Sequence, residues 1–150
     1  SSANLRAEVA EEKASELSTK VRQGAVIRAR GIRLVPLNAR DKEVSRVKNA
    51  SRLRVEFTLA GNDLAEPGER TVYVRITSPD GYVQSNASAA TFEFEGERLT
   101  YTASRDVDYQ NEDLAVGVYY NDGAGFTAGT YRVEVYADGR LAGQSDIVLR

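Results

Sequence analysis

Apolar and polar residues alternate along several segments after residue 50, the pattern of β-strands with one buried face. In the clearest example, residues 52–60, apolar side chains occupy every second position, at Leu53, Val55, Phe57 and Leu59. The same alternation, with Gly, Pro, Asn and Asp between the segments, predicts strands at 70–77, 91–95, 98–103 and 114–120 and a hairpin at 131–149. A short strand is expected to begin at Tyr82 to Gln84, and Phe92 and Phe94 are expected to face inward. Strands that recur without intervening helical patterns predict an antiparallel sandwich rather than a βαβ fold.

Two further segments complete the predicted sandwich. Residues 25–37 predict an extended or bulged first strand, which Pro36 confines to a sheet edge or to the end of the strand because proline lacks a backbone donor. Residues 38–50 are polar and charged, and predict either a long loop or one short helical turn. Asp106 to Asp113 predicts an acidic loop.

The N-terminal segment has a different pattern. Residues 2–23 are rich in Ala, Glu, Lys and Leu and precede Gly24, which predicts a helix that stops there. Small and apolar residues follow a heptad spacing at Ala3, Ala7, Ala10, Ala14, Leu17 and Val21. We therefore expect residues 1–24 to form an N-terminal α-helix and residues 25–150 a sandwich. The helix could be a coiled-coil stalk, could pack on the sandwich, or could be largely frayed.

The C-terminal hairpin carries a family resemblance. Asp138-Gly139 predicts a tight type I′ turn between two strands. The sequence Ala128-Gly129-Thr130-Tyr131 resembles the tyrosine corner of immunoglobulin-like and fibronectin-like bacterial sandwiches. The resemblance implies an immunoglobulin-like antiparallel β-sandwich in which the Tyr131 hydroxyl bonds to the backbone just upstream. The inter-sheet Cys pair and buried Trp of antibody domains are absent.

The order of a helical segment before a sandwich is similar to membrane-anchored envelope proteins of Gram-negative bacteria. This second resemblance implies an extracytoplasmic, periplasmic or envelope location and a scaffolding or partner-binding role. A membrane would then be reached only through an anchor that this chain does not contain. The expected partners are another protein, or a second copy bound through residues 1–24.

Composition narrows the chemistry. The 150 residues include no Cys and no His, which excludes Ser-His-Asp and Cys-His catalytic arrangements and zinc sites of the usual composition. No phosphate-binding glycine loop is present. We therefore expect no enzymatic activity and no cofactor. The net charge of −2 is unevenly divided, because residues 1–60 contain 13 basic and 7 acidic side chains.

The basic stretch supplies the candidate partner-binding residues. Two neighbouring strands are expected to point Arg28, Arg30, Arg52 and Arg54 outward. Such a ridge could contact an acidic partner, or its charges could be paired across the strands. Aromatic residues for stacking on bases are missing from this stretch, so we expect no nucleic-acid partner.

Two further sites remain as alternatives. The oxygen-rich residues Asp106, Asp108, Asn111 and Asp113 are weak calcium candidates, because their spacing does not fit an EF-hand and the sequence favours a solvated acidic loop. Exposed tyrosines beside this acidic loop could instead form a glycan- or ligand-binding module. The sequence favours a non-catalytic envelope scaffold or protein-protein interaction module over that alternative.

Overall fold

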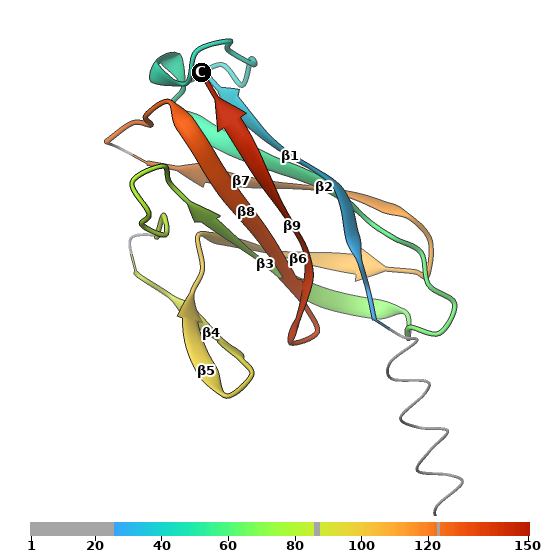
Figure 1. Ribbon diagram of the computed structural model, residues 1–150. Helices are drawn as coiled ribbons and strands as arrows, with labels where there is room; N and C mark the ends of the chain where they lie inside the picture. The colour runs from blue at the N-terminus through green and yellow to red at the C-terminus, as the bar shows by residue number, and fades with distance from the viewer. Residues whose placement is uncertain (1–25, 86–87, 123) are drawn as a thin grey trace, which may run out of the picture.

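The protein folds as two packed antiparallel sheets with a separate hairpin (Figure 1). The computed structural model describes residues 26–85, 88–122 and 124–150. The strands are β1 (Ala29–Leu37), β2 (Arg52–Leu59), β3 (Gly68–Thr77), β4 (Thr91–Phe94), β5 (Glu97–Thr100), β6 (Ala103–Tyr109), β7 (Leu114–Asn121), β8 (Gly129–Ala137) and β9 (Arg140–Leu149). One 3-10 turn, η1 (Val47–Asn49), interrupts the β1–β2 loop.

The predicted fold class needs one correction. The strands are antiparallel, as predicted, and no α-helix occurs in the described ranges, so the fold class of the described residues is all-β rather than all-β with a helix. The helix predicted for residues 2–23 lies outside the described residues. It is based on local helix propensity and stays a prediction.

Each sheet has a defined order and register. One sheet has the order β1-β2-β7, and the other has the order β6-β3-β8-β9. β1 is therefore an edge strand, which explains why it tolerates Pro36. Its register with β2 shifts between Arg30 and Arg33, where Gly31 has a φ of 64° and forms the bulge. β7 forms the opposite edge of this sheet.

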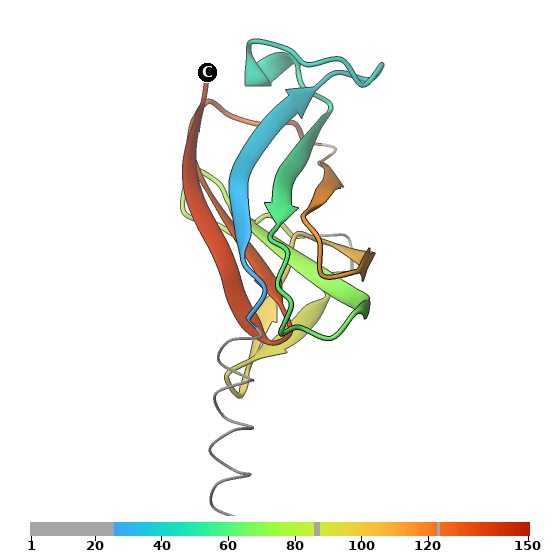
Figure 2. The ribbon, with the colours of Figure 1, turned by 90° about the vertical axis from the view of Figure 1, so that its right-hand side faces the viewer.

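The main core lies between the two sheets, which form two layers in Figure 2. The alternating apolar residues of β2 and β3 all face inward and are buried. They meet Val116 and Val118 of β7 and Val133 and Val135 of β8. The polar positions between them necessarily face outward, so the sequence alternation determines which side chains line each outer surface.

The β4–β5 hairpin covers the outer face of the four-stranded sheet. Phe92 of β4 is buried and its ring stacks on Tyr73 of β3, with centroids 4.7 Å apart and planes 7° from parallel. Phe92 and Phe94 both contact the Tyr136 ring, each at 5.0 Å. Thus Phe92, which was expected to face inward, packs in a second aromatic cluster outside the main core.

Two local predictions differ from the structure. The expected acidic loop from Asp106 to Asp113 is partly strand, because β6 extends to Tyr109 and pairs with β3. Val107 and Tyr109 alternate with the two aspartates and are buried, and this burial holds the segment in the sheet. The short strand expected at Tyr82 to Gln84 is only an isolated bridge between Thr77 and Val83.

The C-terminal hairpin has the geometry that its sequence predicts. Asp138 and Gly139 have φ values of 53° and 70°, so both central turn residues have positive φ as a type I′ turn requires. The Tyr131 hydroxyl donates to the carbonyl oxygen of Thr127 at 2.6 Å, which is the upstream backbone bond that the resemblance implies. This bond ties the start of β8 to the loop that leads into it.

Candidate functional site

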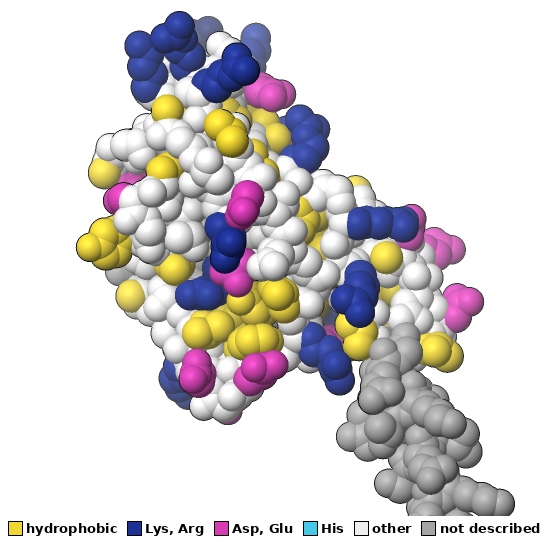
Figure 3. Space-filling view, in the orientation of Figure 1, with side chains coloured by type: hydrophobic (Ala, Val, Ile, Leu, Met, Phe, Trp, Pro, Cys, Tyr) yellow, Lys and Arg dark blue, Asp and Glu magenta, His cyan; other side chains and the backbone are white. Residues whose placement is uncertain are grey.

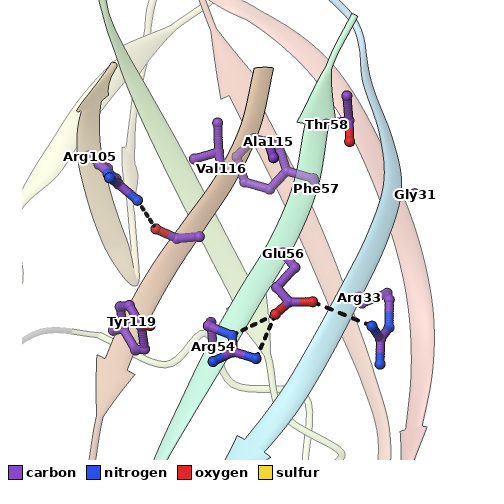
Figure 4. A pocket seen from close by; sticks show the side chains of 11 residues that line it. Gly31, Arg33, Arg54, Glu56, Phe57, Thr58, Arg105, Ala115, Val116 and Tyr119 are labelled. Carbon is purple, nitrogen blue, oxygen red and sulfur yellow. Dashed lines mark hydrogen bonds and ion pairs between the residues drawn. The ribbon is translucent and has the colours of Figure 1, made fainter. Parts of the chain in front are cut away.

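A shallow groove crosses the outer face of the three-stranded sheet. Its volume is about 630 Å³. Figure 4 shows the groove over β1, β2 and β7, with Arg105 of β6 reaching its edge. The side chains that decide its chemistry are Arg33, Arg54, Glu56, Arg105 and Tyr119. Three guanidinium groups against one carboxylate leave the groove with an excess of positive charge.

Glu56 holds two of these arginines in place. Its Oε1 lies 2.6 Å from the Arg54 guanidinium, and its Oε2 lies 3.4 Å from Arg33 Nη1. These contacts follow from the register, in which Arg33 is directly opposite Glu56 on the neighbouring strand. One carboxylate shared by two guanidinium groups leaves part of their hydrogen-bonding capacity open to a further acceptor.

Tyr119 forms an exposed aromatic surface beside the arginines. Its side chain lies on β7 opposite Arg54, and the residue remains 46% exposed. The guanidinium carbon of Arg52 lies 4.5 Å from the ring centroid and that of Arg54 lies 6.0 Å from it, within cation–π range. The hydrogen bond with Tyr119 and, less strongly, the charge of Glu56 raise the pKa of Arg54 above its ordinary value. Arg54 therefore carries its charge at any physiological pH.

Gly117 and Arg105 complete the groove. Gly117 has no side chain, and a Cβ there would lie 3.7 Å from Arg54 Cδ, so the aliphatic part of Arg54 lies close over the β7 backbone. Arg105 Nη1 donates to the Gly117 carbonyl oxygen at 2.7 Å, which connects β6 of one sheet to the edge strand of the other. Arg105 makes no ion pair within the described ranges.

The four predicted partner-binding arginines are not gathered at one site. Arg30 pairs with Asp113, Arg52 pairs with Asp41, and Arg54 pairs with Glu56. Arg28 is exposed and has no ion pair among the residues described. Only Arg54 lines the groove, and Arg52 supports it through Tyr119. The grouping of Arg33, Arg105 and Tyr119 with Arg54 was not predicted, because it depends on the register between strands far apart in the sequence.

A second positive surface, the basic tip, lies at one end of the sandwich. Figure 3 shows Lys and Arg side chains gathered at the end where η1 and the C-terminus lie in Figure 1. None of the five cations of the basic tip makes an ion pair within the described part of the chain, and all are exposed: Arg40, Lys42, Arg46, Lys48 and Arg150. The first four belong to the basic stretch that the sequence shows, but only the fold separates them from the paired strand arginines.

The calcium candidates are engaged elsewhere. Asp106 accepts a hydrogen bond from Thr71 at 2.7 Å, and Asp108 accepts one from Gln110 at 2.6 Å. Asp113 pairs with Arg30 and also accepts from a backbone N–H. Within residues 26–85, 88–122 and 124–150, no three acidic side chains are grouped so that they could hold a metal ion. The predicted loop site is therefore not assembled.

The tyrosines are not assembled into a platform either. Tyr109 and Tyr120 are buried, and the Tyr109 hydroxyl donates to the Ala60 carbonyl oxygen at 2.9 Å. Tyr73 lies under the β4–β5 hairpin. Tyr82 and Tyr119 are exposed, but Tyr82 follows the β3–β4 turn whereas Tyr119 lies on the outer face of β7. A sugar-stacking surface would need several rings side by side.

The comparisons with known proteins add a family and weak structural likenesses. No curated protein matches the chain in sequence. The AlkC alkylpurine DNA glycosylase of Pseudomonas fluorescens, solved with abasic-site DNA, is 13% identical with a TM-score of 0.47, over 85% of this chain and 32% of its own. A β-glucosidase of Kluyveromyces marxianus is 12% identical with a TM-score of 0.40, over 80% of this chain and 15% of its own.

A β-glucosidase of Paenibacillus barengoltzii is 15% identical with a TM-score of 0.38, over 83% of this chain and 14% of its own. This chain thus spans a third or less of each of these proteins, and the likenesses are too weak to indicate a function. The described residues include no helix with the length and apolar character of a membrane span. The family comparison matches residues 30–150, and the chain therefore belongs to the DUF8428 family, a domain of unknown function.

Proposed function

We propose that this domain is a non-catalytic protein-interaction module, and that the arginine-lined groove is its contact surface. The observation that carries the proposal is the exposed Tyr119 ring beside the guanidinium groups of Arg52 and Arg54 in a hollow of the sheet face. Tyr and Arg are, with Trp, the residue types enriched among the contacts that dominate binding energy in protein interfaces. Tyr119 is also held by its neighbours, so ordering it in a complex costs little entropy.

The groove favours an acidic and extended partner segment. Its three arginines exceed its single carboxylate by two charges, and Arg33 and Arg54 share that carboxylate. A partner carboxylate in the groove would accept charge-assisted hydrogen bonds from the guanidinium groups that line it. The groove is open and shallow, so it accommodates a chain lying along the sheet more readily than an enclosed small molecule.

Binding of an acidic peptide tests this proposal directly. The probe is a fluorescent peptide of alternating Glu and Val, and the matched control peptide has Gln in place of Glu. We expect the acidic peptide to bind more tightly than the Gln peptide. Tyr119→Ala should weaken acidic-peptide binding at least about tenfold, as substitution of a dominant interface residue does.

Tyr82→Ala is the matched control variant, because Tyr82 is 74% exposed but lies outside the groove. It should leave the affinity unchanged. Equal losses for Tyr119→Ala and Tyr82→Ala, or equal affinity for the two peptides, would contradict the proposal. The envelope location implied by the sequence resemblance remains a prediction, and the groove proposal does not depend on it.

A further inference from the structure

The basic tip is a second charged surface that the groove does not use. No residue of the tip lines the groove. The β1–β2 loop supplies four of its cations and the end of β9 supplies Arg150, and the two segments are joined by a 2.6 Å hydrogen bond from the Val47 N–H to the Arg150 carbonyl oxygen. Val47 is buried and anchors η1 to the core, so the tip projects from a fixed base.

Local acidic residues do not neutralise the tip. Asp41 pairs with Arg52 at the start of β2, which leaves Glu43 as the other acidic side chain of the loop. By contrast, several strand arginines on the sheet faces have an ion-pair partner. The tip therefore gathers five cations without an ion pair among the described residues at one end of the domain, whereas the other such arginines are dispersed over the rest of it.

The tip also contains a place for a single phosphate group. A hollow of about 290 Å³ is lined by Ser45, Arg46 and Arg150. Two guanidinium groups and a hydroxyl are the donors that phosphate oxygens accept most readily. We propose that the basic tip binds the phosphate groups of an anionic phospholipid surface, with one headgroup phosphate in this hollow.

The distribution of charge over the domain supports an extended flat surface as the partner. Asp63, Glu66 and Glu69 lie in and after the β2–β3 loop, at the end of the sandwich opposite the tip, and make no ion pairs within the described residues. An anionic surface attracts the tip and repels this opposite end, which orients the long axis of the domain. The first described residues also lie at the end of the sandwich away from the tip (Figure 1).

Features expected of a nucleic-acid site are missing from the tip. Residues 38–50 contain no aromatic side chain on which a base could stack. The tip protrudes from the end of the sandwich rather than forming a channel for a strand (Figure 3). Lys and Arg side chains on a protruding loop instead suit lipid headgroups, where each cation near the surface strengthens binding about fivefold. The contact is made by the domain itself and needs no separate anchor.

Vesicle binding with charge-matched variants tests the proposal. The wild-type chain should co-sediment with vesicles of phosphatidylcholine and phosphatidylglycerol at low salt, but not with phosphatidylcholine alone. The double variant Arg46→Gln/Lys48→Gln should lower the partition coefficient about twenty-five-fold, because each lost charge weakens binding about fivefold. The control Arg98→Gln/Arg140→Gln removes the same charge from exposed arginines outside the tip, and should change binding less than about twofold.

Three results would each point to an explanation other than lipid binding by the tip. Equal losses in the two double variants would overturn the proposal, because the net charge and not the tip would then govern binding. Saturation of the tip amides by millimolar inorganic phosphate without vesicle binding would show a free-phosphate site and overturn the lipid partner. Tighter binding to single-stranded DNA than to vesicles at equal phosphate concentration, lost in the tip variant, would replace the lipid with nucleic acid. Unchanged circular dichroism melts verify that the variants fold.

Discussion

Replacing Tyr131 with Phe removes one hydroxyl and leaves the packing of the ring in place. The Tyr131 residue is 1% exposed, and its hydroxyl donates to the Thr127 carbonyl oxygen at 2.6 Å. Leaving a buried acceptor without its donor costs about 1–3 kcal/mol. Thr127 itself is exposed, so water can reach its carbonyl group after the substitution. We therefore expect a loss near the lower end, about 1–1.5 kcal/mol.

Urea unfolding measures this loss. With a denaturant dependence of about 1–3 kcal/mol per molar for a small domain, the midpoint should fall by roughly 0.3–1.5 M. Tyr82→Phe is the control, because Tyr82 is 74% exposed and its hydroxyl lies in solvent. If both variants unfold at the wild-type midpoint, the hydrogen bond contributes no net stability and the tyrosine-corner reasoning is refuted.

Three further predictions concern packing and titration. Gly143→Ala should destabilise the domain by about 1–3 kcal/mol, because a Cβ at this position would lie 2.6 Å from a β1 carbonyl oxygen. The control Gly117→Ala should change the free energy of unfolding by less than about 0.5 kcal/mol, and urea unfolding midpoints compare the two variants. Phe92→Ala should lower the free energy of unfolding in urea by about 3 kcal/mol, because the Phe92 side chain is 6% exposed and its ring stacks on Tyr73. A loss below about 1 kcal/mol would mean that Phe92 does not anchor the β4–β5 hairpin to the sheet. Burial raises the pKa of Tyr131 above its ordinary 10.0, so this tyrosine ionises first in the unfolded chain and the stability of the domain should fall as the pH rises above 10. The melting temperature of a Tyr131→Phe variant should fall less steeply with pH than that of the wild type. An identical pH dependence in the two proteins would contradict the raised pKa of Tyr131.

Alternation of apolar residues predicted most strands because it reports burial directly. In β2 and β3 the inward positions were read correctly from the sequence, since each has a single buried face. β6 was missed in part because its outward positions are Asp106 and Asp108, and two charges beside Val107 resemble a loop. What distinguishes the strand is the pairing of this segment with β3, a contact between residues distant in sequence.

The aromatic residues show a second limit of sequence patterns. Phe92 has the spacing of an inward-facing strand residue, but it packs on Tyr73 and Tyr136 outside the main core. Alternation gives the two faces of a strand and does not say which other element covers each face. The hairpin could therefore be predicted from the sequence, whereas its docking position on the outer face could not.

The region of the groove could be predicted from the sequence, but most of the residues that line it could not. The basic stretch and its outward strand arginines were visible in the sequence, and Arg54 does line the groove. The Glu56 contact with Arg33 and the position of Tyr119 opposite Arg54 both depend on register. The basic tip differs from the strand arginines because loop residues have no cross-strand neighbour to pair with. Charge alone could not separate these two groups.

Backbone amide NMR during titration with the acidic peptide most directly tests whether the groove is the contact surface. The groove account predicts the largest chemical-shift changes in β2 and β7, around Arg54 and Tyr119, with smaller changes at residues 40–48. Tyr119→Ala should abolish the groove changes and leave those at the basic tip. Changes confined to residues 40–48, or no changes at saturating peptide, would contradict the groove account.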